Sequence, residues 1–123
     1  MKAALVVSHG SRSKKTRQEV LRLVKKLRRQ SSFPIIEYAF LEIEPPDIPT
    51  GIEMCARKGA KEILLLLNFL NSGRHVDIDI PKIAQEARKK YRGIRIHISQ
   101  PVGQHPKICE LFLDLLDRSK IHL

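Results

Sequence analysis

The alternation of strand-like and helix-like segments along this chain predicts an α/β fold in three layers, built on a four-stranded parallel sheet. Apolar runs alternate with amphipathic segments four times, a (βα)4 order that calls for right-handed crossovers. The run KEILLLLNFL, residues 61–70, is the most apolar in the chain, as a central strand covered on both faces should be. The 123 residues, 42% of them hydrophobic, suffice for one core, so we expect a single domain over 1–123.

The first half of the chain supplies two strands and two helices. Residues 2–8 are a short apolar run, and residues 11–30 carry apolar side chains at helical spacing, with a serine near the start able to cap the helix. Residues 35–42 form a second strand, which three prolines in the following turn bring to an end. Residues 50–58 then fit a short helix closed by Gly59.

The second half repeats the pattern twice. The strand at 61–70 is followed by a helix at 81–91, which starts with proline as helices often do. Residues 94–99 alternate as a strand, and residues 107–120 form a final amphipathic helix. The face of that helix expected to lie against the core consists of Ile108, Leu111, Phe112 and Leu115.

Charge and cysteine content narrow the function classes. The net charge of +10 favours an anionic partner, such as nucleic acid, an anionic surface or a polycarboxylate ligand. Cys55 and Cys109 both lie in apolar helical patterns, so we expect reduced, buried thiols, no disulfide and a cytoplasmic location. No apolar stretch approaches the roughly 20 residues of a membrane span, so we expect no membrane partner, and the N-terminus does not match a signal peptide.

Three histidines and a carboxylate follow the four predicted strands at their carboxyl ends. His9, Glu42, His75 and His105 come after the first, second, third and fourth strand, while the loops at the opposite edge offer none of these groups. Because open parallel sheets bind ligands beyond the carboxyl ends of their strands, this asymmetry indicates a site. Imidazoles and a carboxylate can bind a divalent transition metal or take protons near neutral pH.

The spacing alone matches no local metal signature, so structural or solvated roles stay open for these residues. Glu42 could instead cap the next helix, His105 before a proline is expected to be structural, His97 to be packing or surface, and His122 to have no specific role. The chain has no dinucleotide glycine motif, P-loop or GxSxG elbow, which excludes nucleotide and serine-hydrolase chemistry. Nucleic-acid binding by the basic first helix is a minor alternative, because only 5% of the residues are aromatic.

Four segments in the right order resemble a known family. They are LVVSHGSR near the start, AFLE with the prolines after it, FLNSGRHVDIDIP after the third strand, and PVGQHP near the end. Together they are similar to the small sirohydrochlorin chelatases, the CbiX-like branch of the class II tetrapyrrole chelatases, over nearly the whole chain. One departure is Asn68, which stands where the family commonly has a proline before its FL.

The resemblance implies a fold, a function and an assembly. The fold is a flavodoxin-like chelatase half-domain, and the function is insertion of Co²⁺ or Fe²⁺ into sirohydrochlorin for cobalamin or siroheme, with Ni²⁺ as a variation. His9 and His75 match the family's metal-handling histidines, and Glu42 matches an acidic position used in some members. The metal is then a substrate, and no permanently bound cofactor is implied. Short members pair as homodimers around a shared cleft.

The two histidine turns also fit a polycarboxylate macrocycle. Arg12 and Arg74 lie within them, and Lys14 and Arg17 follow closely. The residues expected to bind the substrate are Ser11, Arg12, Leu70, Asn71, Ser72, Gly73 and Arg74.

Catalysis is assigned to His9, His75 and Glu42. A neutral imidazole can hold the incoming metal or accept a pyrrolic proton, and the carboxylate can assist either step. Activity should therefore fall as acid protonates imidazole. A noncatalytic tetrapyrrole or metal carrier that uses the same cleft is the alternative that the sequence leaves open.

Overall fold

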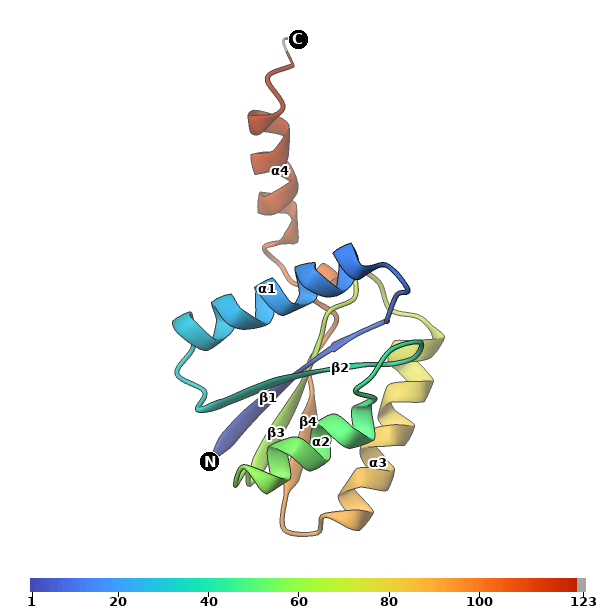
Figure 1. Cartoon of the computed structure of the whole chain (residues 1–123). Helices are drawn as coiled ribbons and strands as arrows, with labels where there is room; N and C mark the ends of the chain where they lie inside the picture. Colours follow the sequence, from blue (N-terminus) through green and yellow to red (C-terminus); the bar gives the residue numbers. More distant parts are fainter. Residues whose placement is uncertain (122–123) are drawn as a thin grey trace.

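Four parallel strands form one sheet in the order β2-β1-β3-β4. The computed structural model describes residues 1–121, so the prediction for His122 lies outside the described residues. The strands are β1 (Lys2–Ser8), β2 (Ile35–Phe40), β3 (Glu62–Leu67) and β4 (Arg95–Ile98). The α/β class and the parallel four-stranded sheet predicted from the sequence are confirmed (Figure 1).

Helices lie on both faces of this sheet. The step from β1 to β2 runs in one direction across the sheet and the next two steps run in the other. Right-handed crossovers therefore place α1 (Lys14–Gln30) on one face, and α2 (Ile48–Arg57) and α3 (Ile80–Lys90) on the opposite face (Figure 1). A π-helical turn, η1 (His75–Asp79), leads into α3.

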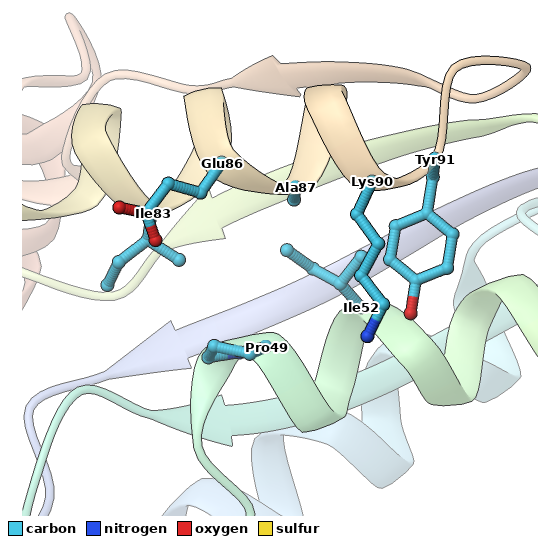
Figure 2. A pocket seen from close by; sticks show the side chains of 7 residues that line it. All are labelled: Pro49, Ile52, Ile83, Glu86, Ala87, Lys90 and Tyr91. Carbon is cyan, nitrogen blue, oxygen red and sulfur yellow. The ribbon is translucent and has the colours of Figure 1, made fainter.

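The two faces have separate apolar cores of unequal size. The larger core packs α2 and α3 against the sheet, with fully buried side chains such as Ile52, Leu65 and Ile80. The smaller core packs α1 against β1 and β2 through Val20, Val24 and neighbours on the strands. Between α2 and α3 a groove opens on the outside of the larger core. Figure 2 shows the side chains that line it, Pro49, Ile52, Ile83, Glu86, Ala87, Lys90 and Tyr91.

The last helix does not pack as its sequence predicts. A short 3-10 turn, η2 (Val102–Gln104), precedes α4 (Ile108–Arg118), and α4 extends away from the sheet (Figure 1). None of its residues is buried, so the predicted inner face is wrong for the isolated chain. The predicted burial of Cys109 is wrong for the same reason, since this thiol is exposed, whereas Cys55 is buried as predicted and both are free.

Several predicted boundaries shift because of local chemistry. The second strand ends at Phe40 instead of residue 42, and the third ends at Leu67 instead of residue 70, since the chain turns to place polar groups at the sheet edge. The second helix begins at Ile48, two residues early, because the Asp47 carboxylate caps it by accepting a hydrogen bond from the Thr50 amide at 2.9 Å. Among the described residues, no helix is both long enough and apolar enough to cross a membrane.

Candidate metal centre

Three side chains from separate turns converge at the carboxyl edge of the sheet. The ligand atoms of His9, Glu42 and His75 all lie within 4.8 Å of one another. His9 Nε2 is 2.6 Å from Glu42 Oε1, and the two imidazole rings meet edge to face with their centroids 5.1 Å apart. The sequence prediction that the fold would bring these three residues together is therefore confirmed as a matter of geometry.

The backbone at the end of β1 sets the His9–Glu42 contact. Hydrogen bonds from Leu41 N to Ser8 O and from Glu42 N to His9 O continue the β1–β2 pairing beyond the strands. Gly10 has a φ of +106°, and a Cβ placed there would lie 1.9 Å from the Glu42 carbonyl oxygen. Only glycine allows the two turns to approach this closely, which explains why HG follows the strand.

The π-helical turn η1 orients His75. Five consecutive residues, HVDID, make this turn, and it brings Asp79 Oδ2 to 2.8 Å from His75 Nδ1. A carboxylate that accepts the Nδ1 proton leaves Nε2 free to bind a metal, an arrangement common among metal-binding histidines. The sequence analysis did not predict a role for Asp79. Its position four residues after His75 could have indicated the contact, because side chains four residues apart on a helix lie close together.

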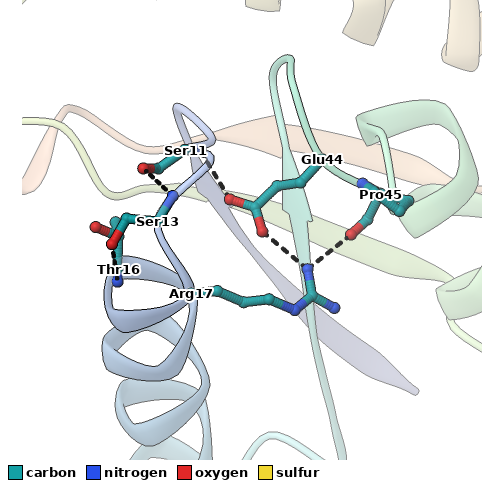
Figure 3. Close-up of polar contacts among 6 residues, drawn as sticks. All are labelled: Ser11, Ser13, Thr16, Arg17, Glu44 and Pro45. Atoms are coloured by element: carbon teal, nitrogen blue, oxygen red, sulfur yellow. Dashed lines mark hydrogen bonds and ion pairs between the residues drawn. The ribbon is translucent and has the colours of Figure 1, made fainter.

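A second carboxylate holds the turn that carries Glu42. Glu44 accepts hydrogen bonds from the Ser11 amide at 2.7 Å and from Arg17 Nη1 at 2.9 Å, and Arg17 also donates to the Pro45 carbonyl (Figure 3). Between the two acids, Ile43 has a φ of 73°, a left-handed conformation that is strained for a β-branched residue. The strained residue lies between the acid that faces His9 and the acid that faces Arg17.

These contacts change the predicted role of Arg17. The sequence placed it with the basic groups available to a polycarboxylate, but its guanidinium is bound to Glu44 and lies 5.5 Å from the centre of the Phe40 ring. Arg17 on α1 therefore has a structural role: it holds the turn that follows β2. Glu44 itself was missed, because nothing local in the sequence pairs it with an arginine 27 positions away.

The other predicted substrate-binding residues lie on the two loops that carry His9 and His75. Ser11 is half-buried and its hydroxyl accepts a hydrogen bond from the Ser13 amide. Arg12 is exposed and lines a hollow of about 370 Å³ beside the turn that carries Glu44. On the loop after β3, the remaining predicted residues are all exposed: Leu70, Asn71, Ser72, Gly73 and Arg74.

The remaining histidines lie apart from the cluster. His105 Nδ1 accepts a hydrogen bond from the Lys107 amide just before α4, in keeping with the structural role expected for it. His97 is exposed on β4 and its Nε2 lies 3.2 Å from Glu62 Oε2. Asn68, which replaces the proline common in the family, makes a specific contact. Its side-chain amide donates a hydrogen bond to Ser8 Oγ at 3.0 Å and connects the ends of β3 and β1 next to His9.

The cluster has the chemistry of an open site for a borderline divalent metal. Two imidazoles and one carboxylate provide nitrogen and oxygen donors, which suit iron, cobalt, nickel and zinc better than magnesium or calcium. His9 and Glu42 are about half exposed, with side-chain exposures of 50% and 49%. Three protein donors with open access leave coordination positions for a further ligand.

Comparison with known proteins agrees with this chemistry. The sequence model of the CbiX family matches residues 3–119. A chloroplastic sirohydrochlorin ferrochelatase of Arabidopsis thaliana is 30% identical over 97% of this chain and 53% of its own length. A sirohydrochlorin cobaltochelatase of Sulfolobus acidocaldarius is 29% identical over 94% of this chain and 89% of its own length.

A solved structure gives the same picture. The sirohydrochlorin chelatase SirB from Bacillus subtilis subspecies spizizenii, in complex with cobalt, superposes with a TM-score of 0.87 and 32% identity, over 96% of this chain and 50% of SirB. The chain thus spans about half the length of the longer relatives that it matches.

Proposed function

This chain belongs to the CbiX family, and from that premise we propose that it inserts a divalent metal, Co²⁺ or Fe²⁺, into sirohydrochlorin. The observation that carries the proposal is the convergence of His9, Glu42 and His75 within 4.8 Å at the carboxyl edge of the sheet. The relatives named as ferrochelatases and cobaltochelatases support the substrate and the reaction.

The cluster residues would carry out the reaction, and a neighbouring carboxylate would position them. Metal insertion requires that the ion lose water and that two pyrrolic N–H groups lose their protons. The imidazoles of His9 and His75 would hold the ion, and Glu42, which faces His9, would accept one of the two protons. The second proton would pass to an imidazole that is free once the ion has moved to the macrocycle, and from there to solvent. The Asp79 carboxylate keeps His75 oriented throughout.

The substrate's carboxylates meet the exposed cations. Arg12 and Arg74 lie on the two loops that flank the cluster, and both are exposed. Guanidinium groups bind carboxylates in pairs of charge-assisted hydrogen bonds, so they can fix the orientation of a flat polycarboxylate ring above the metal. We expect the exposed loop of Leu70 to Gly73 to contact the apolar surface of the ring.

We propose that the functional unit is a homodimer in the cytoplasm. One sheet edge offers one wall for a large flat ring, and the longer relatives have about twice the length of the matched segment, so a second copy would provide the opposite wall. Two free cysteines, Cys55 and Cys109, support a reducing compartment.

Timed metallation under anaerobic conditions tests the reaction itself. With protein far below sirohydrochlorin in concentration, a chelatase completes many turnovers, whereas a noncatalytic carrier stops at one equivalent. Running Co²⁺, Fe²⁺ and Ni²⁺ in parallel identifies the preferred metal, and we expect Co²⁺ or Fe²⁺ to be inserted faster than Ni²⁺. Metallation no faster than the uncatalysed rate with any of the three metals contradicts the proposal.

Substitution of the cluster tests the site. We expect His9→Ala and His75→Ala each to weaken Co²⁺ binding about 10- to 100-fold and to reduce turnover severely, with the far-UV circular dichroism unchanged. His97→Ala is the matched control, because this exposed histidine also contacts a carboxylate but lies elsewhere on the sheet. Equal Co²⁺ affinity in all three variants would refute the assignment, as would turnover that stays constant between pH 7.5 and 5.

Gly10 tests the geometry without removing a ligand. Gly10→Ala places a methyl group against the Glu42 carbonyl and must push the two turns apart. We expect Co²⁺ affinity to fall at least about tenfold, the cost of a misplaced ligand. Gly93→Ala is the control, since a Cβ there meets nothing within 4 Å and affinity should not change.

A further inference from the structure

We infer that Glu44 is a positioning residue for the cluster: its carboxylate holds the turn after β2 against the turn after β1, and so fixes Glu42 against His9. The inference rests on the metal site proposed above. It adds a residue that acts on two of the three donors through the backbone and not on the metal itself.

Glu44 connects three segments of the chain. Its Oε2 accepts a hydrogen bond from the Ser11 amide at 2.7 Å, and its Oε1 accepts one from Arg17 Nη1 at 2.9 Å (Figure 3). The Glu44 side chain is only 11% exposed, so water competes little for its oxygens. Hydrogen bonds to an ionised acceptor are roughly twice as strong as neutral ones. Glu44 therefore links the turn after β2 strongly to the turn after β1 and to the first turn of α1.

This link runs beside the contact between the cluster residues. Ser11 lies two residues after His9, and Glu44 lies two residues after Glu42. The turns are joined by Glu42 N to His9 O at 3.1 Å, by His9 Nε2 to Glu42 Oε1 at 2.6 Å, and by Ser11 N to Glu44 Oε2 at 2.7 Å. Because His9 and Glu42 are each about half exposed, water competes for their side-chain contact. The better covered contact of Glu44 keeps the pair together.

The backbone at Ile43 explains why such a link is needed. The Glu44 amide donates to Glu42 O at 2.9 Å across Ile43, whose φ is 73°, and these are the features of a γ-turn of the rare, strained kind. Strain of this kind persists only where the surrounding structure enforces it. Burial of Ile43 does not enforce it, since this residue is more than half exposed. The contacts of the Glu44 carboxylate hold the turn, and the turn directs Glu42 toward His9.

The other end of the link is firmly anchored. Arg17 donates to the Pro45 carbonyl at 3.0 Å as well as to Glu44, and its guanidinium lies 5.5 Å from the centre of the buried Phe40 ring. A guanidinium held by two acceptors and an aromatic face has little freedom to move. Glu44 is therefore attached to packed parts of α1 and β2.

The two carboxylates that support the cluster act on different donors. Asp79 orients His75 from within η1, whereas Glu44 holds the turns of His9 and Glu42 together. Residues that orient metal ligands in this way affect metal affinity without binding the metal.

A cobalt titration of Glu44 variants gives the first test. We expect Glu44→Ala to raise the Co²⁺ dissociation constant about tenfold, as loss of a residue that orients a metal ligand does. Glu44→Gln keeps an acceptor for one of the two donors, so its affinity should lie between wild type and Glu44→Ala, and it is the variant to measure should Glu44→Ala not fold. Glu53→Ala is the matched control, because it breaks a 2.6 Å ion pair with an arginine on α2 and should leave affinity unchanged. Wild-type affinity in the Glu44 variants overturns the inference.

A double-mutant cycle with Glu42 separates positioning from a general loss of stability. Glu44→Ala should weaken Co²⁺ binding about tenfold when Glu42 is present, but less than about twofold in a Glu42→Ala background, where no carboxylate remains to be misplaced. The visible absorption of bound Co²⁺ reports its donors, and it should change in the same direction in Glu44→Ala and Glu42→Ala. A tenfold loss in both backgrounds overturns the inference, because Glu44 would then act on the fold as a whole.

Hydrogen exchange without metal tests the link directly. The Glu42 amide donates to His9 O between the two turns, and the Asn68 amide donates to Val7 O at the end of β3. In Glu44→Ala we expect protection of the Glu42 amide to fall at least about tenfold and that of the Asn68 amide to stay unchanged, because only the turns separate. Unchanged protection at Glu42, or an equal fall at both amides, overturns the inference.

The two kinds of measurement separate this inference from the proposed function. A wild-type protein that binds no Co²⁺ contradicts the metal site, while the expected loss of protection at Glu42 in Glu44→Ala still supports the positioning role. A wild-type protein that binds Co²⁺ through the cluster, with Glu44→Ala equal to it in affinity and in exchange, leaves the metal site standing and overturns the inference.

Discussion

The two faces of the sheet differ in how completely they are covered. On one face α2 and α3 lie over the strands and bury Ile63, Leu65 and Leu67 of β3 almost fully. On the other face α1 covers β1 and β2 only, and the alternate residues of the same strand, Leu64 and Leu66, stay partly exposed. Consecutive leucines on β3 therefore alternate between a fully covered core and a partly covered one.

The difference shows that only one of the two apolar faces is completed within the chain. The covered face is complete within one chain, so it can support the sheet and the cluster at its edge. The other face leaves Leu64 and Leu66 partly exposed, and no residue of α4 is buried in the described part of the chain. Stability should therefore depend more on the first face than on the second.

The largest expected effect compares two leucines that follow each other on β3. Leu65→Ala leaves a cavity in the covered core and should cost about 3 kcal/mol of unfolding free energy. Leu66→Ala removes a partly exposed side chain and should cost only about 1 kcal/mol. Urea unfolding of both variants, at the same protein concentration, measures the contrast.

The partly covered face can also be tested for a role in association. Leu66→Ala should weaken the proposed homodimer about tenfold if this face contacts the second copy, because Leu66 lines an apolar groove of about 110 Å³ between α1 and β3. Sedimentation equilibrium measures the dissociation constant. A dimer unchanged by Leu66→Ala would break the comparison, since both faces would then serve the monomer alone.

The covered face can be predicted well from the sequence, because the patterns that specify it lie within single segments of the chain. Periodicity and the apolar run of β3 are enough to predict the order of elements and the parallel sheet. The same periodicity fails for α4: it predicts that Leu111 and Leu115 are buried, but both are more than half exposed, because the pattern carries no information about which surface lies opposite. The predicted burial of Cys109 failed with it.

The cluster follows a similar division. His9, Glu42 and His75 could be placed together, because the carboxyl ends of parallel strands meet at one edge. Their supports could not be predicted as readily. The role of Glu44 depends on a contact with Arg17, which is 27 residues away in the sequence. The role of Asp79 depends on a π-helical turn, which no simple sequence pattern predicts. Strand ends were also misplaced by two or three residues at this edge.

The buried Cys55 and the exposed Cys109 should differ in how they affect stability as pH rises. Burial, with the nearby Glu37 carboxylate, raises the pKa of the Cys55 thiol from 9.0 to about 12. Between about 9 and 12 the unfolded thiol is ionised and the folded one is not, so the unfolded state binds fewer protons and stability falls as pH rises. The slope from one such group is at most about 1.4 kcal/mol per pH unit.

Measurement above pH 9 by urea unfolding checks this. The wild-type protein should lose stability more steeply than Cys55→Ala, in which that group is absent. Cys109→Ala should follow the wild-type curve, because its thiol lies on the exposed α4. Parallel curves for wild type and Cys55→Ala would show that the covered core admits solvent at this position.

The smallest expected effect compares the caps of the helices on the two faces. Asp47 begins α2 on the covered face, and its Oδ1 accepts from the Thr50 amide at 2.9 Å; Ser13 begins α1, and its Oγ accepts from the Thr16 amide at 3.4 Å. Asp47→Ala should cost about 1 kcal/mol at neutral pH, because an anionic cap also interacts favourably with the helix dipole. Ser13→Ala should cost a few tenths of a kcal/mol, roughly the low end for a cap with a long bond.

Acid should remove the contribution of the Asp47 cap and leave that of the Ser13 cap unchanged. Hydrogen bonds from the side chain and the backbone of Thr50 lower the pKa of Asp47 below its usual 3.8. A carboxylate with a lowered pKa stabilises the fold above its unfolded pKa, and the contribution is lost as pH falls through the folded value. Unfolding of Asp47→Ala and wild type should therefore converge below about pH 3.8, whereas the small cost of Ser13→Ala should not vary with pH, because a hydroxyl does not titrate there. A cost for Asp47→Ala that persists unchanged in acid would mean that packing at the start of α2 matters there, and the charge does not.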